Sequence, residues 1–175
     1  MDILIMLNDK SLKAIEKRGI VIKALKEKNI TIKEIESMIN ETDEKKSAII
    51  FEAIEAVTNS DAQIADIGWL NLAVENILSA SDSIKREASR IVGNISHKFP
   101  NDLEKAIEKL LFNSKAVGTV VRWSSAYALS RIIVIPQYAN SELFEKLTEI
   151  CILEEESGVK NQYIKALKKA SKIRL

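Results

Sequence analysis

A short residue pattern recurs along the chain and constrains its fold more than any other feature. Counted from its first residue as position 0, apolar or small residues recur at +4, +7, +8 and +11, and a basic residue follows at +1. This spacing places the apolar residues on one face of an α-helix. The copies read Ile84-Lys85-x-x-Ala88-x-x-Ile91-Val92-x-x-Ile95, Val121-Arg122-x-x-Ser125-x-x-Ala128-Leu129-x-x-Ile132 and Val159-Lys160-x-x-Tyr163-x-x-Ala166-Leu167-x-x-Ala170.

The copies start 37 and 38 residues apart, at 84, 121 and 159, and a weaker copy starts at Asp43. A period of about 40 residues is typical of stacked helix pairs, in which each pair buries its apolar face against its neighbours. The sequence therefore predicts an all-α protein with one domain over residues 1–175. The expected helix pairs cover about 1–28, 29–59, 60–98, 99–135 and 136–175.

Partner helices are expected between the copies, at about 31–40, 62–79, 101–113 and 140–155, with an earlier helix over about 10–28 that contains Gly19. Polar residues stand two positions before each copy and are expected to cap its helix. These are Asp82, Thr119 and Ser157. Pro136 is expected to end the preceding helix.

Composition agrees with a helical fold and excludes several classes of protein. Only 5 Gly and 2 Pro occur among 175 residues, so few residues interrupt helices. The net charge is +1, so any attraction to an anionic partner must be local. Cys151 is the single cysteine and is expected to be buried. Because no signal sequence or membrane span is apparent, we expect a cytoplasmic protein without membrane contact.

The repeated pattern resembles the HEAT-repeat family, in which a turn is followed by Val-Arg and an Ala-x-x-Ala-Leu helix. The residues that carry this resemblance are Asp82-Ser83-Ile84-Lys85-Arg86-Glu87-Ala88 and Val121-Arg122-Trp123-Ser124-Ser125-Ala126-Tyr127-Ala128-Leu129. The resemblance implies a right-handed α–α superhelix, of the armadillo-like α-solenoid type. It also implies that an Asp–Arg ladder between repeats is partial here, since the basic residue at +1 is arginine only at Arg122.

In that family the second helix of each pair lines a concave surface. Positions +2, +6, +9 and +13 point away from the apolar face, and these positions predict a basic surface with aromatic residues and no acid after Glu52. The predicted partner-binding residues are Arg86, Arg90, Trp123, Tyr127, Lys165, Lys168 and Lys172.

Three interpretations of this surface remain open. It can be a solvated face with Trp123 and Tyr127 packed on adjacent repeats. It can bind a protein or peptide with an acidic segment, for which tryptophan, tyrosine and arginine are good anchors. It can also bind nucleic acid through phosphates and stacked bases. We expect a non-enzymatic scaffold that binds a protein or peptide, with nucleic-acid binding as the alternative and the oligomeric state open.

Catalytic, metal and cofactor sites are not expected. The chain has one histidine, His97, and lacks a glycine-rich phosphate loop and the usual hydrolase and metal-binding motifs. The basic concave face also resembles that of the alkylpurine DNA glycosylases, which place an Asp beside Trp residues. No Asp accompanies Trp123 on the predicted inner face, so no catalytic residue is transferred from that resemblance.

Overall fold

The computed structural model describes residues 2–175, and within that range the chain forms helices and turns but no β-strand. The all-α prediction is therefore confirmed. The α-helices are α1 (Ile3–Asn8), α2 (Ala14–Lys26), α3 (Ile32–Glu41), α4 (Glu44–Ser60), α5 (Ile67–Asn76), α6 (Asp82–Ile95), α7 (Glu104–Asn113), α8 (Thr119–Ile132), α9 (Pro136–Ala139), α10 (Leu143–Leu153) and α11 (Ser157–Ala170). Two 3-10 helices are η1 (Ala62–Ile64) and η2 (Ser96–Lys98).

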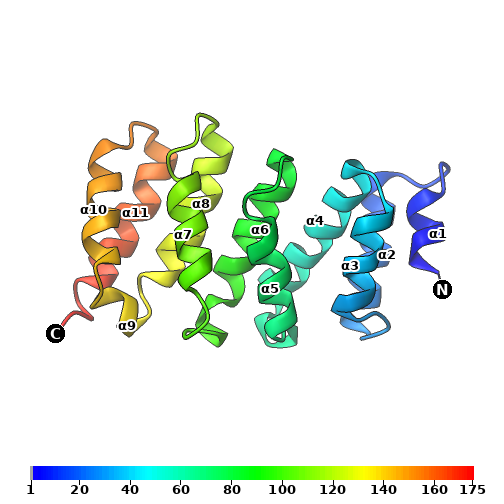
Figure 1. Cartoon of the computed structure of the whole chain (residues 1–175), viewed down its shortest axis with the longest axis horizontal. Helices are drawn as coiled ribbons and strands as arrows, with labels where there is room; N and C mark the ends of the chain where they lie inside the picture. Colours follow the sequence, from blue (N-terminus) through cyan, green and yellow to red (C-terminus); the bar gives the residue numbers. More distant parts are fainter. Residues whose placement is uncertain (1) are drawn as a thin grey trace.

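The helices pack in two layers. Helices α1, α3, α5, α7 and α10 pack respectively against α2, α4, α6, α8 and α11. The second members of these pairs also pack against one another in chain order, and we call them the inner layer. Figure 1 shows the elements following one another in a row, with the two termini at opposite ends. Packing is thus mainly between helices of the same pair or of adjacent pairs.

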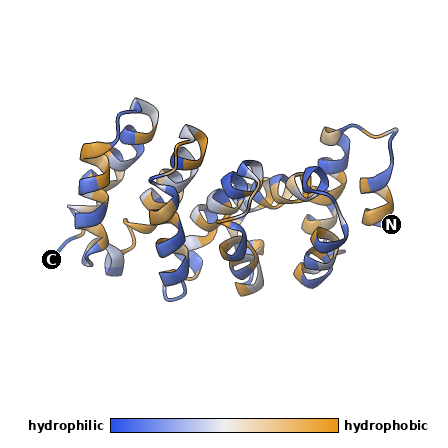
Figure 2. Ribbon diagram, turned by 45° about the horizontal axis from the view of Figure 1, so that its top comes forward, coloured by the Kyte–Doolittle hydropathy of each residue, from blue (hydrophilic) through white to orange (hydrophobic). Residues whose placement is uncertain are grey.

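The apolar positions of the repeated pattern form the interior. In the three clear copies, every residue at 0, +4, +7, +8 and +11 is buried except Leu167, which is half-buried. Cys151 is buried, as expected, and Trp69 of α5 is buried as well. Figure 2 shows that individual helices carry both hydrophobic and hydrophilic residues, as expected when each helix buries one face.

Several predicted boundaries are corrected by the structure. The helix expected over about 10–28 starts at Ala14, and Ile15, assigned to its apolar stripe, is exposed. The segment expected as one helix over 62–79 divides into η1 and α5. The helix before Pro136 does end ahead of it, and Pro136 then starts α9, which the sequence did not indicate.

The expected helix caps are wrong at the three clear copies. Helices α6, α8 and α11 begin one residue earlier than the pattern indicates, and none has a side-chain hydrogen bond from its N-cap residue. Asp82, Thr119 and Ser157 are instead the first residues of these helices. Asp43 does cap a helix, since its carboxylate accepts the backbone N–H of Lys46 at 3.0 Å.

Helices α6 and α8 approach each other closely at Gly93. A Cβ atom at this position would lie 3.0 Å from the Cα of Ala128 and 3.0 Å from two ring carbons of Tyr127. Real Cβ atoms rarely approach backbone so closely, so glycine permits this packing. By contrast, a Cβ atom at Gly19 in α2 would meet no atom within 4 Å.

We predict that Gly93→Ala destabilises the protein by about 1–3 kcal/mol, because overpacking outweighs the better helix propensity of alanine. Gly19→Ala should stabilise it by up to about 1 kcal/mol, because only helix propensity changes there. Urea unfolding followed by circular dichroism measures both effects. Equal stabilisation by the two substitutions would contradict the close approach at Gly93.

An ion pair joins α8 to the end of α10. The Nε of Arg122 lies 3.0 Å from Glu154 Oε2, and its Nη1 donates to the carbonyl oxygens of Ala116 and Val117 at 3.0 and 2.9 Å. Burial opposes ionisation of Glu154, but hydrogen bonds from Arg122 and from the backbone N–H of Glu156 outweigh it. They hold the pKa of Glu154 below its usual value. Arg122, the arginine at position +1 of its copy, is therefore paired with a glutamate rather than with the aspartate of an Asp–Arg ladder.

The lowered pKa predicts a pH-dependent contribution to stability. The Arg122–Glu154 pair should stabilise the fold above the usual glutamate pKa of about 4.3, and this stabilisation should be lost as the pH falls through the folded-state value. Glu154→Gln should therefore destabilise the protein by about 2 kcal/mol at pH 7 and much less at pH 3. Thermal unfolding between these pH values tests this, with exposed Glu149→Gln as the control. An equal loss at both pH values would contradict the role of the ionised pair.

Candidate functional site

The predicted partner-binding residues lie on the inner layer, where adjacent helices form three shallow depressions. The first depression is lined by Arg18, Glu52, Glu55, Ala56, Arg86, Glu87 and Arg90. The second is lined by Thr58, Asn59, Ala62, Gly93, Asn94, Ser96, His97, Arg131 and Val134. The third is lined by Ser130, Arg131, Val134, Gln162, Lys165, Ala166 and Lys169. Arg131 and Val134 belong to both the second and the third, so these two are continuous.

Charges in the first depression neutralise one another. Arg90 lies 2.8 Å from Glu55 and 3.3 Å from Glu87. Arg86 also pairs with Glu87, and one of its nitrogens lies 3.9 Å from Glu52. Three arginines thus face three glutamates, and the first depression carries no net charge.

The expectation that no acid follows Glu52 on this surface is therefore wrong. Glu55 and Glu87 lie on the sides of α4 and α6 that face each other. They occupy positions +12 and +3 of their copies, which belong neither to the apolar face nor to the face predicted to bind a partner. Glu87 is 3% exposed. A carboxylate is buried in this way only when a cation pairs with it. For Glu87 the cations are Arg86 and Arg90 of the same helix. Arg86 and Arg90 are consequently engaged within the protein.

Tyr127 is also not the exposed platform that the sequence suggested, since it is only 8% exposed. Its hydroxyl donates to Asn94 Oδ1 at 2.6 Å, and Asn94 Nδ2 donates to Thr58 Oγ1 at 3.1 Å. Burial raises the pKa of Tyr127, so the phenol remains a hydrogen-bond donor at neutral pH. This chain of bonds connects α8, α6 and α4 beneath the inner surface.

Trp123 remains accessible, at 36% exposed. Its ring stacks on Tyr127 with centroids 5.6 Å apart and planes 26° apart. Gln162 of α11 donates a hydrogen bond to the carbonyl oxygen of Trp123 at 3.2 Å. The exposed part of the indole is therefore held in a fixed position at the edge of the inner surface.

The basic residues predicted on α11 are exposed, and none forms an ion pair with another described residue. They are Lys165 and Lys168, which lie on α11, and Lys172, which the structure places in the turn just beyond the end of α11. Only Lys165 lines the third depression, and sequence reasoning missed two cations beside it, Arg131 and Lys169. Arg131 follows the predicted residue Tyr127 by four positions, and Lys169 follows Lys165 by four. This spacing places each pair on one face of its helix and could have identified both cations.

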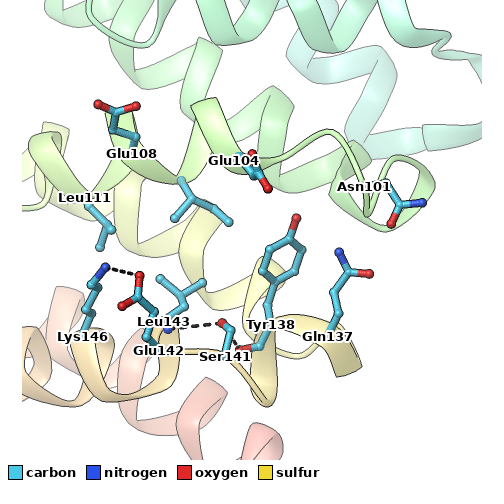
Figure 3. A pocket seen from close by; sticks show the side chains of 11 residues that line it. Asn101, Glu104, Glu108, Leu111, Gln137, Tyr138, Ser141, Glu142, Leu143 and Lys146 are labelled. Atoms are coloured by element: carbon cyan, nitrogen blue, oxygen red, sulfur yellow. Dashed lines mark hydrogen bonds and ion pairs between the residues drawn. The ribbon is translucent and has the colours of Figure 1, made fainter.

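Another depression, of about 600 Å³, lies on the opposite layer between α7 and the α9–α10 segment. Figure 3 shows Glu104, Glu108 and Leu111 of α7 facing Tyr138 and Leu143 of the α9–α10 segment across it. Its polar groups are partly engaged, since Tyr138 and Gln137 donate to the carbonyl oxygen of Pro100 and Lys146 pairs with Glu142 at 2.7 Å.

Residues 2–175 contain no group of three or more histidine, cysteine, aspartate or glutamate side chains placed to hold a metal ion. In the same range, no helix has the length and apolar character needed to cross a membrane. The acids of the inner depressions are glutamates, and each pairs with arginine.

Comparison with models of protein families and with curated proteins finds no match. Among solved structures, the chain is similar to a crystal structure of an engineered protein from the Northeast Structural Genomics Consortium. The TM-score is 0.67 and the identity 15%, and the match covers 98% of this chain and 80% of that one. At this identity the similarity shows the fold alone.

Replacing buried tyrosines tests the bond network beneath the site. Tyr127→Phe removes a donor from Asn94 and should destabilise the protein by about 1–2 kcal/mol. The control is Tyr163→Phe, because the hydroxyl of Tyr163 is buried and has no partner, so its removal should be neutral or stabilising. Chemical denaturation gives both values, and equal losses would contradict the proposed network.

Proposed function

We propose that this protein is a non-enzymatic binding scaffold of the HEAT-repeat type, whose inner surface binds an acidic segment of a protein or peptide. In this proposal the helix pairs form a right-handed, armadillo-like superhelix of about five repeats, and the inner surface is its concave face. The observation that supports it most is the uncompensated positive charge on α8 and α11. Three cations and no acid line the third depression, and its lining residue Gln162 is hydrogen-bonded to the backbone of Trp123, whose side chain is accessible.

The distribution of charge favours one end of the inner surface as the binding site. In the first depression each arginine is paired with glutamate, so an incoming anion would have to compete with short ion pairs. In the third depression the cations have no carboxylate partner, so an acidic segment would gain ion pairs without breaking existing ones. Tryptophan adds a rigid apolar contact next to these charges.

Nucleic-acid binding is the second candidate, and the same residues favour it. Lysine and arginine neutralise phosphates, and an exposed indole can stack on a base. The two candidates differ in salt dependence. For nucleic acid, the logarithm of the affinity should fall by about 0.7–0.9 per neutralised phosphate for each tenfold rise in salt. The cytoplasm is the compartment we propose for either function.

A direct test uses a fluorescein-labelled peptide of alternating aspartate and glutamate, measured by fluorescence anisotropy. Lys165→Glu combined with Lys172→Glu should weaken binding about tenfold or more, because two attractive charges become repulsive. Trp123→Ala should also weaken binding of the peptide, because the proposal places the indole in contact with the bound segment. The matched control is Lys23→Glu with Lys26→Glu on α2, which changes net charge equally and should have little effect.

Equal loss of affinity in the two charge-reversed proteins would contradict the proposed location. A labelled DNA single strand and duplex, measured at about 50 and about 200 mM salt, form the second arm of the test. Tight DNA binding that disappears at the higher salt, without peptide binding, would replace the proposed function by the nucleic-acid alternative.

A further inference from the structure

Arg131 differs from every other arginine of the chain in its surroundings. The other five, Arg18, Arg86, Arg90, Arg122 and Arg174, each pair with a glutamate. Arg131 pairs with no carboxylate within residues 2–175 and lies between the second and third depressions of the inner surface. Its charge is therefore available to a partner from outside the chain.

The guanidinium of Arg131 is nevertheless held in place. Its Cζ lies 3.6 Å from the ring centroid of Tyr127, a distance typical of close cation–π stacking. The Tyr127 ring is itself fixed by its hydrogen bond to Asn94 and by Trp123, which stacks on it. Stacking leaves the N–H groups at the edge of the guanidinium free to donate, and little side-chain entropy remains to be lost on binding.

Two lysines of α11 complete a cluster of cations around the third depression. Lys165 and Lys169 are four residues apart on one helix, so they project from the same face, and both line the depression with Arg131. Lys168 lies between them in sequence but does not line it. The depression has a volume of about 310 Å³, which suits a small charged group rather than a folded surface.

A hydroxyl group adds polar character to the same place. Ser130 lines the third depression, and its Oγ atom is buried without a hydrogen-bond partner. Because this oxygen has almost no accessible surface, an anion in the depression would contact the three cations rather than the hydroxyl. Gln162 contributes an amide side chain to the same lining.

We propose that the third depression binds a phosphoryl group carried by a side chain of the partner segment, such as a phosphoserine. This inference rests on the proposed function and adds to it the chemistry of the group recognised. A phosphoryl group carries about −1.5 to −2 charges near neutral pH and presents three acceptor oxygens. Arginine binds such a group through two parallel hydrogen bonds, and the two lysines supply the remaining positive charge.

The lining of the neighbouring depression favours a protein segment over nucleic acid. A nucleic-acid strand carries a phosphate at every nucleotide and needs cations along its whole path. Apart from Arg131, the second depression offers only His97 as a basic residue, and the rest of its lining is uncharged. The first depression beyond it carries three glutamates. One concentrated cationic point followed by a nearly neutral groove suits a segment whose negative charge is concentrated at one phosphorylated residue, rather than a strand with a phosphate at every unit.

The test is an NMR titration of the labelled whole chain with the peptide Gly-Ala-Ser-Ala-Gly carrying phosphate on its serine. The expected shifts fall on the Nε–H of Arg131 and on the amides around Ser130 and Lys165. Binding should be about tenfold tighter than for the same peptide with glutamate in place of phosphoserine, because a second charge and a bidentate contact are added.

Matched variants separate a built site from a diffuse positive field. Arg131→Gln and Lys169→Gln should each raise the dissociation constant about tenfold, whereas Lys168→Gln should change it less than about twofold. Arg131→Lys keeps the charge but loses the fork of N–H groups, so it should give an intermediate value. Thermal unfolding confirms that each variant is folded, which is expected because Arg131 is exposed.

Each outcome decides the inference. Equal affinities for the phosphoserine peptide and its glutamate counterpart would overturn the inference and leave the proposed function intact. The same conclusion would follow if the phosphoserine peptide did not bind while the aspartate–glutamate peptide still bound. If neither the phosphoserine peptide nor the aspartate–glutamate peptide bound, the inference and the proposed function would be overturned together. Tighter binding of a short DNA strand at the same resonances would assign the depression to nucleic acid and overturn the inference.

Discussion

The close approach of α6 and α8 at Gly93 is the constraint on which the inner surface depends. Because Gly93 has no Cβ, the Tyr127 ring lies directly against α6 and its hydroxyl reaches Asn94. The same ring supports Trp123 on one side and Arg131 within 3.6 Å. A small residue in α6 thereby determines where the charged and aromatic groups of α8 are presented.

Charge is organised unevenly along this surface. Where α4 meets α6, arginines and glutamates are partly buried together, and their pairing limits both to a structural role. Where α8 meets α11, the cations of the third depression have no acidic partner. A net charge of +1 for the whole chain therefore conceals a neutral region and a strongly basic one. Local pairing, rather than total charge, decides which part of the surface can attract an anion.

This division of charge is what supports the proposal of a scaffold that binds an acidic or phosphorylated segment. The paired network of α4 and α6 stiffens the middle of the inner layer, and the buried bond from Tyr127 carries that rigidity to α8. Arg131 then needs no reorganisation to meet a ligand, since its position is already fixed by stacking. The similarity to an engineered protein shows the fold alone and carries no information about function or a partner.

The sequence by itself determined the helical class, the period of the pairs and the buried face of each repeated helix, because these follow from the local spacing of apolar residues. It also identified Trp123 and Lys165 as accessible. Only the tertiary structure decided that Arg86, Arg90 and Tyr127 are engaged within the protein, and that Arg131 and Lys169 share one depression with Lys165. The reason is that a helical projection reports which way a side chain points, whereas its availability depends on the groups that adjacent helices bring against it.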